Sequence, residues 1–210
     1  MITKKFSEDG LVQGQPPLSE GGGGGLSEQG WKTLSSEYIS RYKYFTTRKD
    51  SYESPEGKII PEYYLVELGL TACALAITEK NQVILVKQYR HPIGKTILEL
   101  PGGFVDENEE PEKAIARELL EETGYEFSHF EYAGEVAANP GVLNNYTMLY
   151  LATGGKKIAK QKLDDNEEIE IVLVSLDELK EMLLQNKFVQ ALHVSCILYA
   201  LLKMGNTKLI

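Results

Sequence analysis

The sequence predicts an α/β layered domain with a mixed sheet. Strand-like runs precede and follow one well-marked helix, and two further helical segments close the chain. The first 30 residues contain five consecutive glycines and have the composition of a flexible tail, so they are left out of the fold. We therefore expect a tail over 1–30, an N-terminal strand segment over 31–68 and a main domain over 69–210.

The central helix is expected over 111–123. Pro111 suits the first helical position, acids crowd the first turn, and Gly124 suits the C-terminal cap. The stretch SYESPEGK predicts a turn between two strands. The other expected strands cover 59–68 (interrupted by Pro61), 71–78, 82–89, 130–137, 146–152 and 168–174, and the other helices cover about 176–186 and 188–203.

Composition excludes several classes of protein. The chain has 31 acidic and 22 basic residues, a net charge of -9, and no long Lys/Arg block, so a nucleic-acid partner is not expected. No apolar run has the length needed to cross a bilayer, and the first residues lack the apolar core of a signal peptide, so we expect a soluble, cytoplasmic protein without a membrane partner. Cys73 and Cys196 lie in apolar stretches, which favours buried free thiols.

Three glutamates project from one face of the predicted helix. Glu118, Glu121 and Glu122 stand at i, i+3 and i+4, within a single turn. Like charges this close repel one another. One interpretation is a solvated acidic face, and the other is a site for a hard cation such as Mg²⁺ or Mn²⁺, which prefers carboxylate oxygens.

The residues around these glutamates favour the cation site. They complete the pattern G-x5-E-x7-R-E-U-x-E-E-x-G-U, in which U is bulky and apolar or aromatic, at Gly103, Glu109, Arg117, Glu118, Leu119, Glu121, Glu122, Gly124 and Tyr125. This is the Nudix box, and the chain resembles the Nudix hydrolases. The resemblance implies a Nudix-type α/β/α sandwich with a mixed sheet and an N-terminal antiparallel strand segment. It also implies cleavage of a diphosphate bond with Mg²⁺, or alternatively Mn²⁺.

The resemblance also assigns roles within the box. Glu118, Glu121 and Glu122 would ligate the metal together with the backbone carbonyl of Gly102, and Glu121 and Glu122 would count among the catalytic residues. Glu109 and Arg117 would form a structural pair that braces the loop against the helix.

A second segment narrows the branch of the family. Gln88, Tyr89 and Arg90 precede the run Glu99-Leu100-Pro101-Gly102-Gly103, which resembles the ADP-ribose pyrophosphatase and nucleoside diphosphate sugar hydrolase branch. Arg90 would contact the substrate phosphate or ribose, and Glu99 would lie near the metals. Members of this branch commonly have alanine where Gly102 stands. Pro140, 15 residues after Tyr125, agrees with the same branch.

The catalytic base and the adenine contacts are expected outside the box. By resemblance, Glu167 would act as general base or position the attacking water, with Glu168 and Glu170 as alternatives. Tyr44 and Tyr63 would stack on the adenine, from an N-terminal segment that reaches the partner subunit in a homodimer. The three histidines are expected to contribute little, with His193 on a helix face.

The predicted reaction is hydrolysis of ADP-ribose or a related nucleoside diphosphate sugar to a nucleoside monophosphate and a sugar phosphate. Two alternatives stay open. One is a Nudix pyrophosphohydrolase for another nucleotide, such as GDP-mannose or an oxidised nucleoside triphosphate. The other is a non-catalytic regulator that binds ADP-ribose, although such proteins tend to lose box carboxylates and this box is intact.

Overall fold

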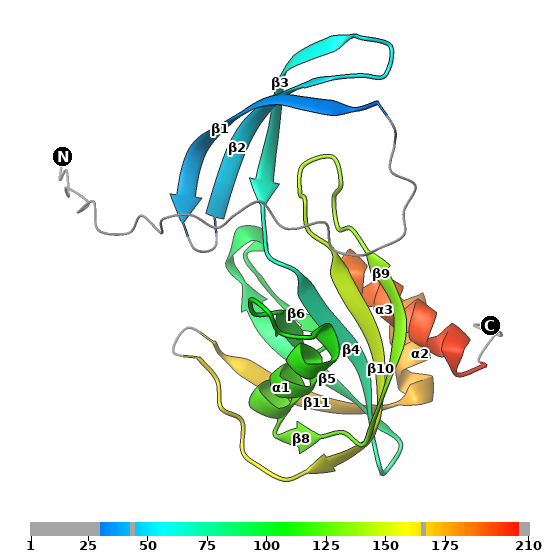
Figure 1. The fold of residues 1–210 in the computed structure, drawn as a ribbon. Helices are drawn as coiled ribbons and strands as arrows, with labels where there is room; N and C mark the ends of the chain where they lie inside the picture. Colours follow the sequence, from blue (N-terminus) through cyan, green and yellow to red (C-terminus); the bar gives the residue numbers. More distant parts are fainter. Residues whose placement is uncertain (1–29, 43–44, 165–166, 206–210) are drawn as a thin grey trace. The chain divides into compact units, whose positions relative to one another are not determined.

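A computed structural model describes residues 30–42, 45–164 and 167–205 (Figure 1). The chain divides into two compact units. The N-terminal unit comprises the described residues up to Leu68 together with Asn139–Asn144, and the main unit comprises Gly69–Ala138 and the described residues from Asn145 onward.

The N-terminal unit is built on a three-stranded antiparallel sheet of β1 (Lys32–Tyr42), β2 (Phe45–Glu53) and β3 (Ile59–Glu67). The predicted turn joins β2 to β3, where the Ser54 carbonyl accepts from the Gly57 N–H at 2.9 Å. Pro61 does not end the strand, because it falls where the register of β2 and β3 shifts between Asp50 and Tyr52. An irregularity tolerates a residue that has no N–H to donate.

The main unit contains one eight-stranded sheet. Its path runs β11-β5-β4-β10-β8, with β6 on β5, β7 on β4 and β9 on β10. The β4–β10 pair is parallel and the other pairs are antiparallel, so the sheet is mixed. The strands are β4 (Thr71–Thr78), β5 (Gln82–Arg90), β6 (Lys95–Glu99), β7 (Gly102–Phe104), β8 (Tyr125–Glu126), β9 (His129–Val136), β10 (Thr147–Lys157) and β11 (Ile169–Ser175).

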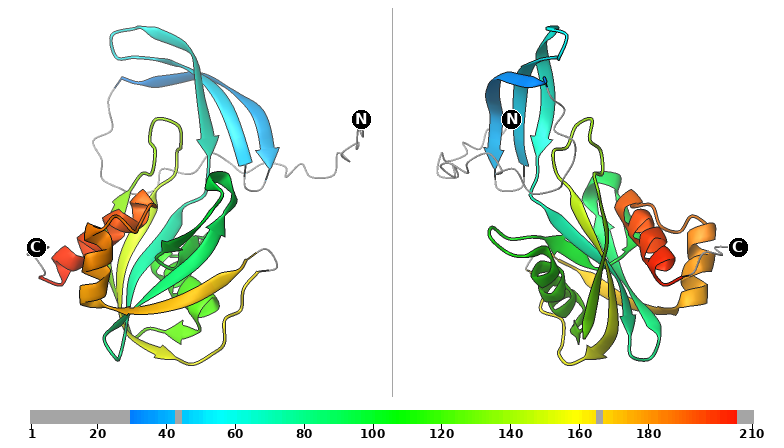
Figure 2. Two further views of the ribbon diagram at one scale, coloured as in Figure 1. Left: turned by 180° about the vertical axis from the view of Figure 1, so that it is seen from behind. Right: turned by 45° about the vertical axis from the view of Figure 1, so that its right-hand side comes forward.

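Helices cover both faces of this sheet (Figure 2). Helix α1 (Pro111–Thr123) packs on one face, and α2 (Leu176–Leu184) and α3 (Ala191–Lys203) pack on the other. Strand β4 explains why both faces are apolar. Ala72, Ala74 and Ala76 pack with the α1 side, whereas Cys73 and Leu75 pack with the α3 side. The predicted α/β/α sandwich with a mixed sheet and an N-terminal antiparallel segment is confirmed.

Helix α1 has the predicted ends. Pro111 occupies the first turn, and Gly124 caps the C-terminus in the left-handed conformation at φ 74°, with its N–H donating to the Leu120 carbonyl at 2.8 Å. Glycine is required there twice over, because a Cβ on Gly124 would also lie 2.2 Å from the Ala159 carbonyl oxygen. Among the described helices, none is both long enough and apolar enough to cross a membrane.

Three short strands and a single-turn 3-10 helix were not predicted. Strand β6 and the helix η1 (His91–Ile93) follow β5 in a hairpin, β7 is a three-residue strand on β4, and β8 is a two-residue strand on β10. Such short segments are too brief to show a periodic apolar pattern. The last helix also begins at Ala191 rather than near residue 188.

Candidate active site

Two of the box glutamates lie against the backbone of strand β7. Glu122 is buried, and its Oε2 accepts a hydrogen bond from the Gly102 N–H at 2.9 Å. Glu118 lies beside the next residue, because a Cβ on Gly103 would fall 2.5 to 2.7 Å from the Glu118 carboxylate atoms. The two glycines therefore allow the strand to approach both carboxylates of the helix.

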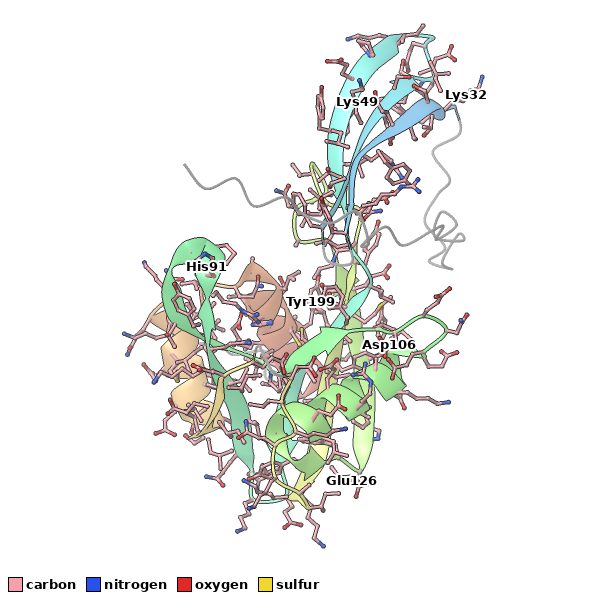
Figure 3. The ribbon with its side chains drawn as sticks, turned by 90° about the vertical axis from the view of Figure 1, so that its left-hand side faces the viewer. Lys32, Lys49, His91, Asp106, Glu126 and Tyr199 are labelled. Atoms are coloured by element: carbon pink, nitrogen blue, oxygen red, sulfur yellow. The ribbon has the colours of Figure 1, made fainter. Side chains whose placement is uncertain are left out.

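Arg117 connects the box loop to the helix. Its Nε and Nη2 donate to the two carboxylate oxygens of Glu109 at 3.0 and 2.9 Å, and Nη2 also donates to the Phe104 carbonyl at 3.0 Å. Its Nη1 pairs with Glu118 at 2.8 Å and with Glu121 at 3.2 Å. The hydrogen bond from Arg117 lowers the pKa of Glu109. Figure 3 shows the loop with Asp106, whose N–H also donates to Glu109 at 3.1 Å.

An ion pair between the half-exposed Arg90 and the buried Glu99 lies at the end of strand β6. Glu99 is 1% exposed, and its Oε2 accepts from Nε and Nη2 of Arg90 at 2.9 and 2.8 Å. Its other oxygen, Oε1, has no hydrogen-bond donor among the described residues. A buried carboxylate oxygen without a donor is costly, and a bound cation would satisfy it.

Burial and mutual repulsion raise the pKa values of the helix carboxylates. Burial raises the pKa of Glu122 to about 8, against the hydrogen bond from Gly102, and the charges of Glu118 and Glu167 raise it further. Burial also raises the pKa of Glu118, with added repulsion from Glu121 and Glu167. Glu167, from the loop between β10 and β11, is therefore close enough to interact with two carboxylates of α1.

These carboxylates have the chemistry of a hard-cation site. Glu118, Glu122 and Glu167 repel one another, Glu99 presents an unsatisfied oxygen, and all are oxygen donors of the kind that Mg²⁺ and Mn²⁺ prefer. Over the described residues, no three His, Cys, Asp or Glu side chains already converge in a metal-binding arrangement. Arg117 pairs with both Glu118 and Glu121 in this structure.

The three candidate bases differ in their surroundings. Glu167 closes a short turn, since its Oε2 accepts from the Asp164 N–H at 3.1 Å and its own N–H donates to the Asp164 carbonyl at 3.0 Å. Glu170 lies on β11 and pairs with Lys87 at 3.1 Å. Glu168 is exposed. Of the three, Glu167 is the one whose charge helps to raise the pKa values of Glu118 and Glu122 on α1.

The tyrosines expected to stack on adenine belong to the N-terminal part of the sequence. Tyr63 lies on β3 in the N-terminal unit, where its hydroxyl donates to the Gly141 carbonyl at 2.7 Å and its ring meets Tyr52 edge-on at 5.7 Å. Tyr44 lies outside the described residues.

Two further side-chain contacts were not predicted. His193, expected to contribute little from a helix face, is buried, and its Nδ1 accepts from the Leu100 N–H at 3.2 Å. Burial and the charge of Arg90 lower the pKa of His193 to about 3, so the ring stays neutral. Gln161 donates from Nε2 to the carbonyls of Glu122 and Ile169. The bonds from Leu100 to His193 and from Gln161 to Glu122 join residues that are 93 and 39 positions apart, so they leave no local sequence signal.

Comparison with family models decides the family. The model of the NUDIX domain matches residues 67–192, more than half of the chain. The chain belongs to the Nudix family. A second model, the nucleoside diphosphate sugar hydrolase N-terminal domain, matches residues 31–66 of this Nudix protein. The Nudix family is generally dependent on divalent metals, in agreement with the carboxylate donors described above.

Two relatives of this Nudix protein carry different names. It is 31% identical to the methanol dehydrogenase activator of Bacillus methanolicus, over 80% of this chain and 91% of that protein. It is also 31% identical to the ADP-ribose pyrophosphatase of Bacillus subtilis, over 82% of this chain and 93% of that protein. A crystal structure of an ADP compounds hydrolase shares the fold with a TM-score of 0.75 at 19% identity, covering 89% of this chain and all of the other.

Proposed function

We propose that this Nudix protein hydrolyses the diphosphate linkage of ADP-ribose or a related nucleoside diphosphate sugar to a nucleoside monophosphate and a sugar phosphate. One observation carries the proposal: a complete Nudix box in which the buried Glu122 interacts with the charge of Arg90, the ion-pair partner of a second buried acid, Glu99. The similarity to a protein named ADP-ribose pyrophosphatase and the match to the nucleoside diphosphate sugar hydrolase N-terminal domain support this substrate class.

Glu118, Glu121, Glu122 and the carbonyl of Gly102 would hold Mg²⁺, or alternatively Mn²⁺. When bound, such a cation supplies charge neutralisation at the diphosphate and lowers the pKa of bound water. The buried position of Glu122 and the close approach of Gly103 to Glu118 fix both side chains relative to β7. Arg117 and Glu109 brace the loop that joins β7 to α1.

Glu167 would accept the proton of the attacking water, or orient that water, because it is the loop residue whose charge interacts with Glu118 and Glu122 of α1. Arg90 would contact the substrate phosphate or ribose. Its guanidinium has one side committed to Glu99 and is 46% exposed, so donors remain for an anionic ligand. Glu99 would thus orient Arg90 and face the metal site with its free oxygen.

The N-terminal unit would provide base recognition and dimerisation, with Tyr44 and Tyr63 stacking on adenine in a homodimer. This unit exposes large apolar side chains that a partner subunit would cover, among them Trp31, Leu34, Ile39, Tyr42, Phe45 and Ile59. The proposed regions are a tail over 1–30, an N-terminal strand segment over 31–68 and the Nudix domain over 69–210. A cytoplasmic location stays a prediction from the sequence.

A substrate panel tests the proposal. Purified protein in Mg²⁺ would be given ADP-ribose, UDP- and GDP-sugars, diadenosine polyphosphates and nucleoside triphosphates, and phosphate would be released from the products by a coupled phosphatase. We expect the highest kcat/KM for ADP-ribose or another nucleoside diphosphate sugar. Equal rates over the panel would contradict the substrate assignment, and binding of ADP-ribose without hydrolysis in Mg²⁺ or Mn²⁺ would indicate a regulator instead.

A further inference from the structure

The segment between β10 and β11 is fastened to the C-terminal turn of α1. The N–H groups of Ile158 and Ala159 donate to the Gly124 carbonyl at 2.9 and 3.1 Å, and the Lys162 N–H donates to the Glu121 carbonyl at 2.8 Å. The last carbonyls of a helix have no partner within the helix. Here the segment that leads toward Glu167 supplies their donors.

The side chain of Gln161 connects helix α1 to strand β11. Its side-chain Nε2 donates to the Glu122 carbonyl at 2.8 Å and to the Ile169 carbonyl at 3.0 Å. Both partners are carbonyl oxygens, so the amide must present its nitrogen to them. One half-buried side chain thereby joins a carboxylate-bearing residue of α1 to the first residue of β11.

Glu167 lies between Gln161 and Ile169 in the chain. It precedes Ile169 by two residues, and its charge interacts with those of Glu118 and Glu122. Its own turn is closed only through Asp164 in the described contacts. Ile169 is held on one side by its pairing with Gln88 of β5, and the Gln161 side chain links it to the helix. The position of Glu167 relative to α1 therefore depends in part on Gln161.

We propose that Gln161 is a positioning residue that holds the Glu167 loop against the carboxylate helix. The inference rests on the proposed function, in which Glu167 acts on the attacking water. Gln161 does not touch the reacting atoms. It fixes the distance between the group that handles the water and the carboxylates that hold the cation, and a displacement of about 1 Å in such a group lowers turnover by about 100-fold.

A double-mutant cycle tests this role. Gln161→Leu keeps the approximate size of the side chain and removes both donors. With ADP-ribose and Mg²⁺, we expect kcat to fall by about 10- to 100-fold with KM changed by less than about 3-fold. In a Glu167→Gln background the same substitution should lower kcat by less than about 3-fold, because the group that Gln161 positions is already disabled. Equal losses in the two backgrounds, or no loss in either, would overturn the proposal.

Two further variants provide a matched control and a milder change at the same position. Gln185→Leu is the same chemical change at an exposed residue of the other helical layer, and it should leave kcat unchanged. Gln161→Asn keeps the amide on a shorter side chain and is the milder change if Gln161→Leu does not fold. It should lower kcat by about 3- to 10-fold, with the same non-additivity toward Glu167→Gln. Additive losses for Gln161→Asn would count against the role as much as those for leucine.

Amide hydrogen exchange separates this inference from the proposed function. In Gln161→Leu, peptides spanning residues 161–169 should exchange at least about 10-fold faster, whereas peptides of α3 should be unchanged. This readout needs no activity. If the wild-type protein hydrolyses nothing in the panel but Gln161→Leu shows the faster exchange, the substrate assignment is refuted and the anchoring role stands. Unchanged exchange over 161–169 would refute the anchoring role itself.

Discussion

Glu122→Gln should stabilise the metal-free protein while it abolishes hydrolysis. Burial raises the pKa of Glu122 from 4.5 to about 8, so the folded protein keeps this proton over a pH range in which the unfolded chain has lost it. Stability is therefore lost as pH rises from 4.5 to 8, at about 1.4 kcal/mol per pH unit. At pH 7 the cost is about 3 kcal/mol. Glutamine resembles the protonated acid, and its oxygen can still accept from the Gly102 N–H.

The assay is denaturant unfolding in a chelating buffer from pH 5 to pH 8, followed by helical circular dichroism. This signal reports the main unit because all three described α-helices lie there, whereas the only tryptophan, Trp31, lies in the N-terminal unit. The advantage of Glu122→Gln should grow with pH and reach about 3 kcal/mol at pH 7. Glu126→Gln makes the same change at an exposed position and should show no such growth. Parallel pH profiles for wild type and Glu122→Gln would refute the reasoning.

Three other predictions concern residues around the same site. Gly102→Ala should destabilise the protein by about 1–3 kcal/mol and lower activity, because the residue has φ 154° and its Cβ would lie 2.2 Å from the Ala72 carbonyl oxygen. Thermal unfolding would measure the loss, with Gly141→Ala as the control at a glycine that has space for a Cβ. His193→Leu should cost about 1–3 kcal/mol by leaving the Leu100 N–H without its acceptor, measured by the same unfolding assay, and an unchanged midpoint would argue against the contact. In a Glu122→Gln background, the lowered pKa of His193 should reduce the free energy of unfolding by about 2 kcal/mol as pH falls from 6.5 to 5, because only the unfolded chain binds the proton. His193→Asn should flatten this pH dependence. A pH dependence that persists in His193→Asn would assign it to other groups.

The carboxylate helix was predictable because its signals are local. Pro111, Gly124 and the i, i+3, i+4 spacing of the glutamates lie within one short segment, and the structure has the helix at the same bounds, 111–123. Strand β4 was predictable for the same reason, since eight consecutive small or apolar residues mark a strand buried on both faces.

The contacts that complete the site were not predictable. The bond from Leu100 to His193 spans 93 residues and that from Gln161 to Glu122 spans 39, and neither residue type has a preferred partner that a sequence pattern reveals. Members of the resembled branch commonly have alanine at the position of Gly102, but this structure leaves no space for one. Strand β7 pairs with β4 so closely that Gly102 has no room for a Cβ, and that pairing has no local signal either.

The central claim is that the carboxylates beside Gly102 and Gly103 support metal-dependent hydrolysis of a nucleoside diphosphate sugar. Product analysis of ADP-ribose turnover tests it most directly, with wild type in Mg²⁺, wild type in chelator, and Glu122→Gln in Mg²⁺. We predict AMP and ribose 5-phosphate from wild type in Mg²⁺, no product in chelator, and a loss of at least about 100-fold for Glu122→Gln. Turnover by Glu122→Gln at the wild-type rate, or undiminished turnover in chelator, would contradict the claim.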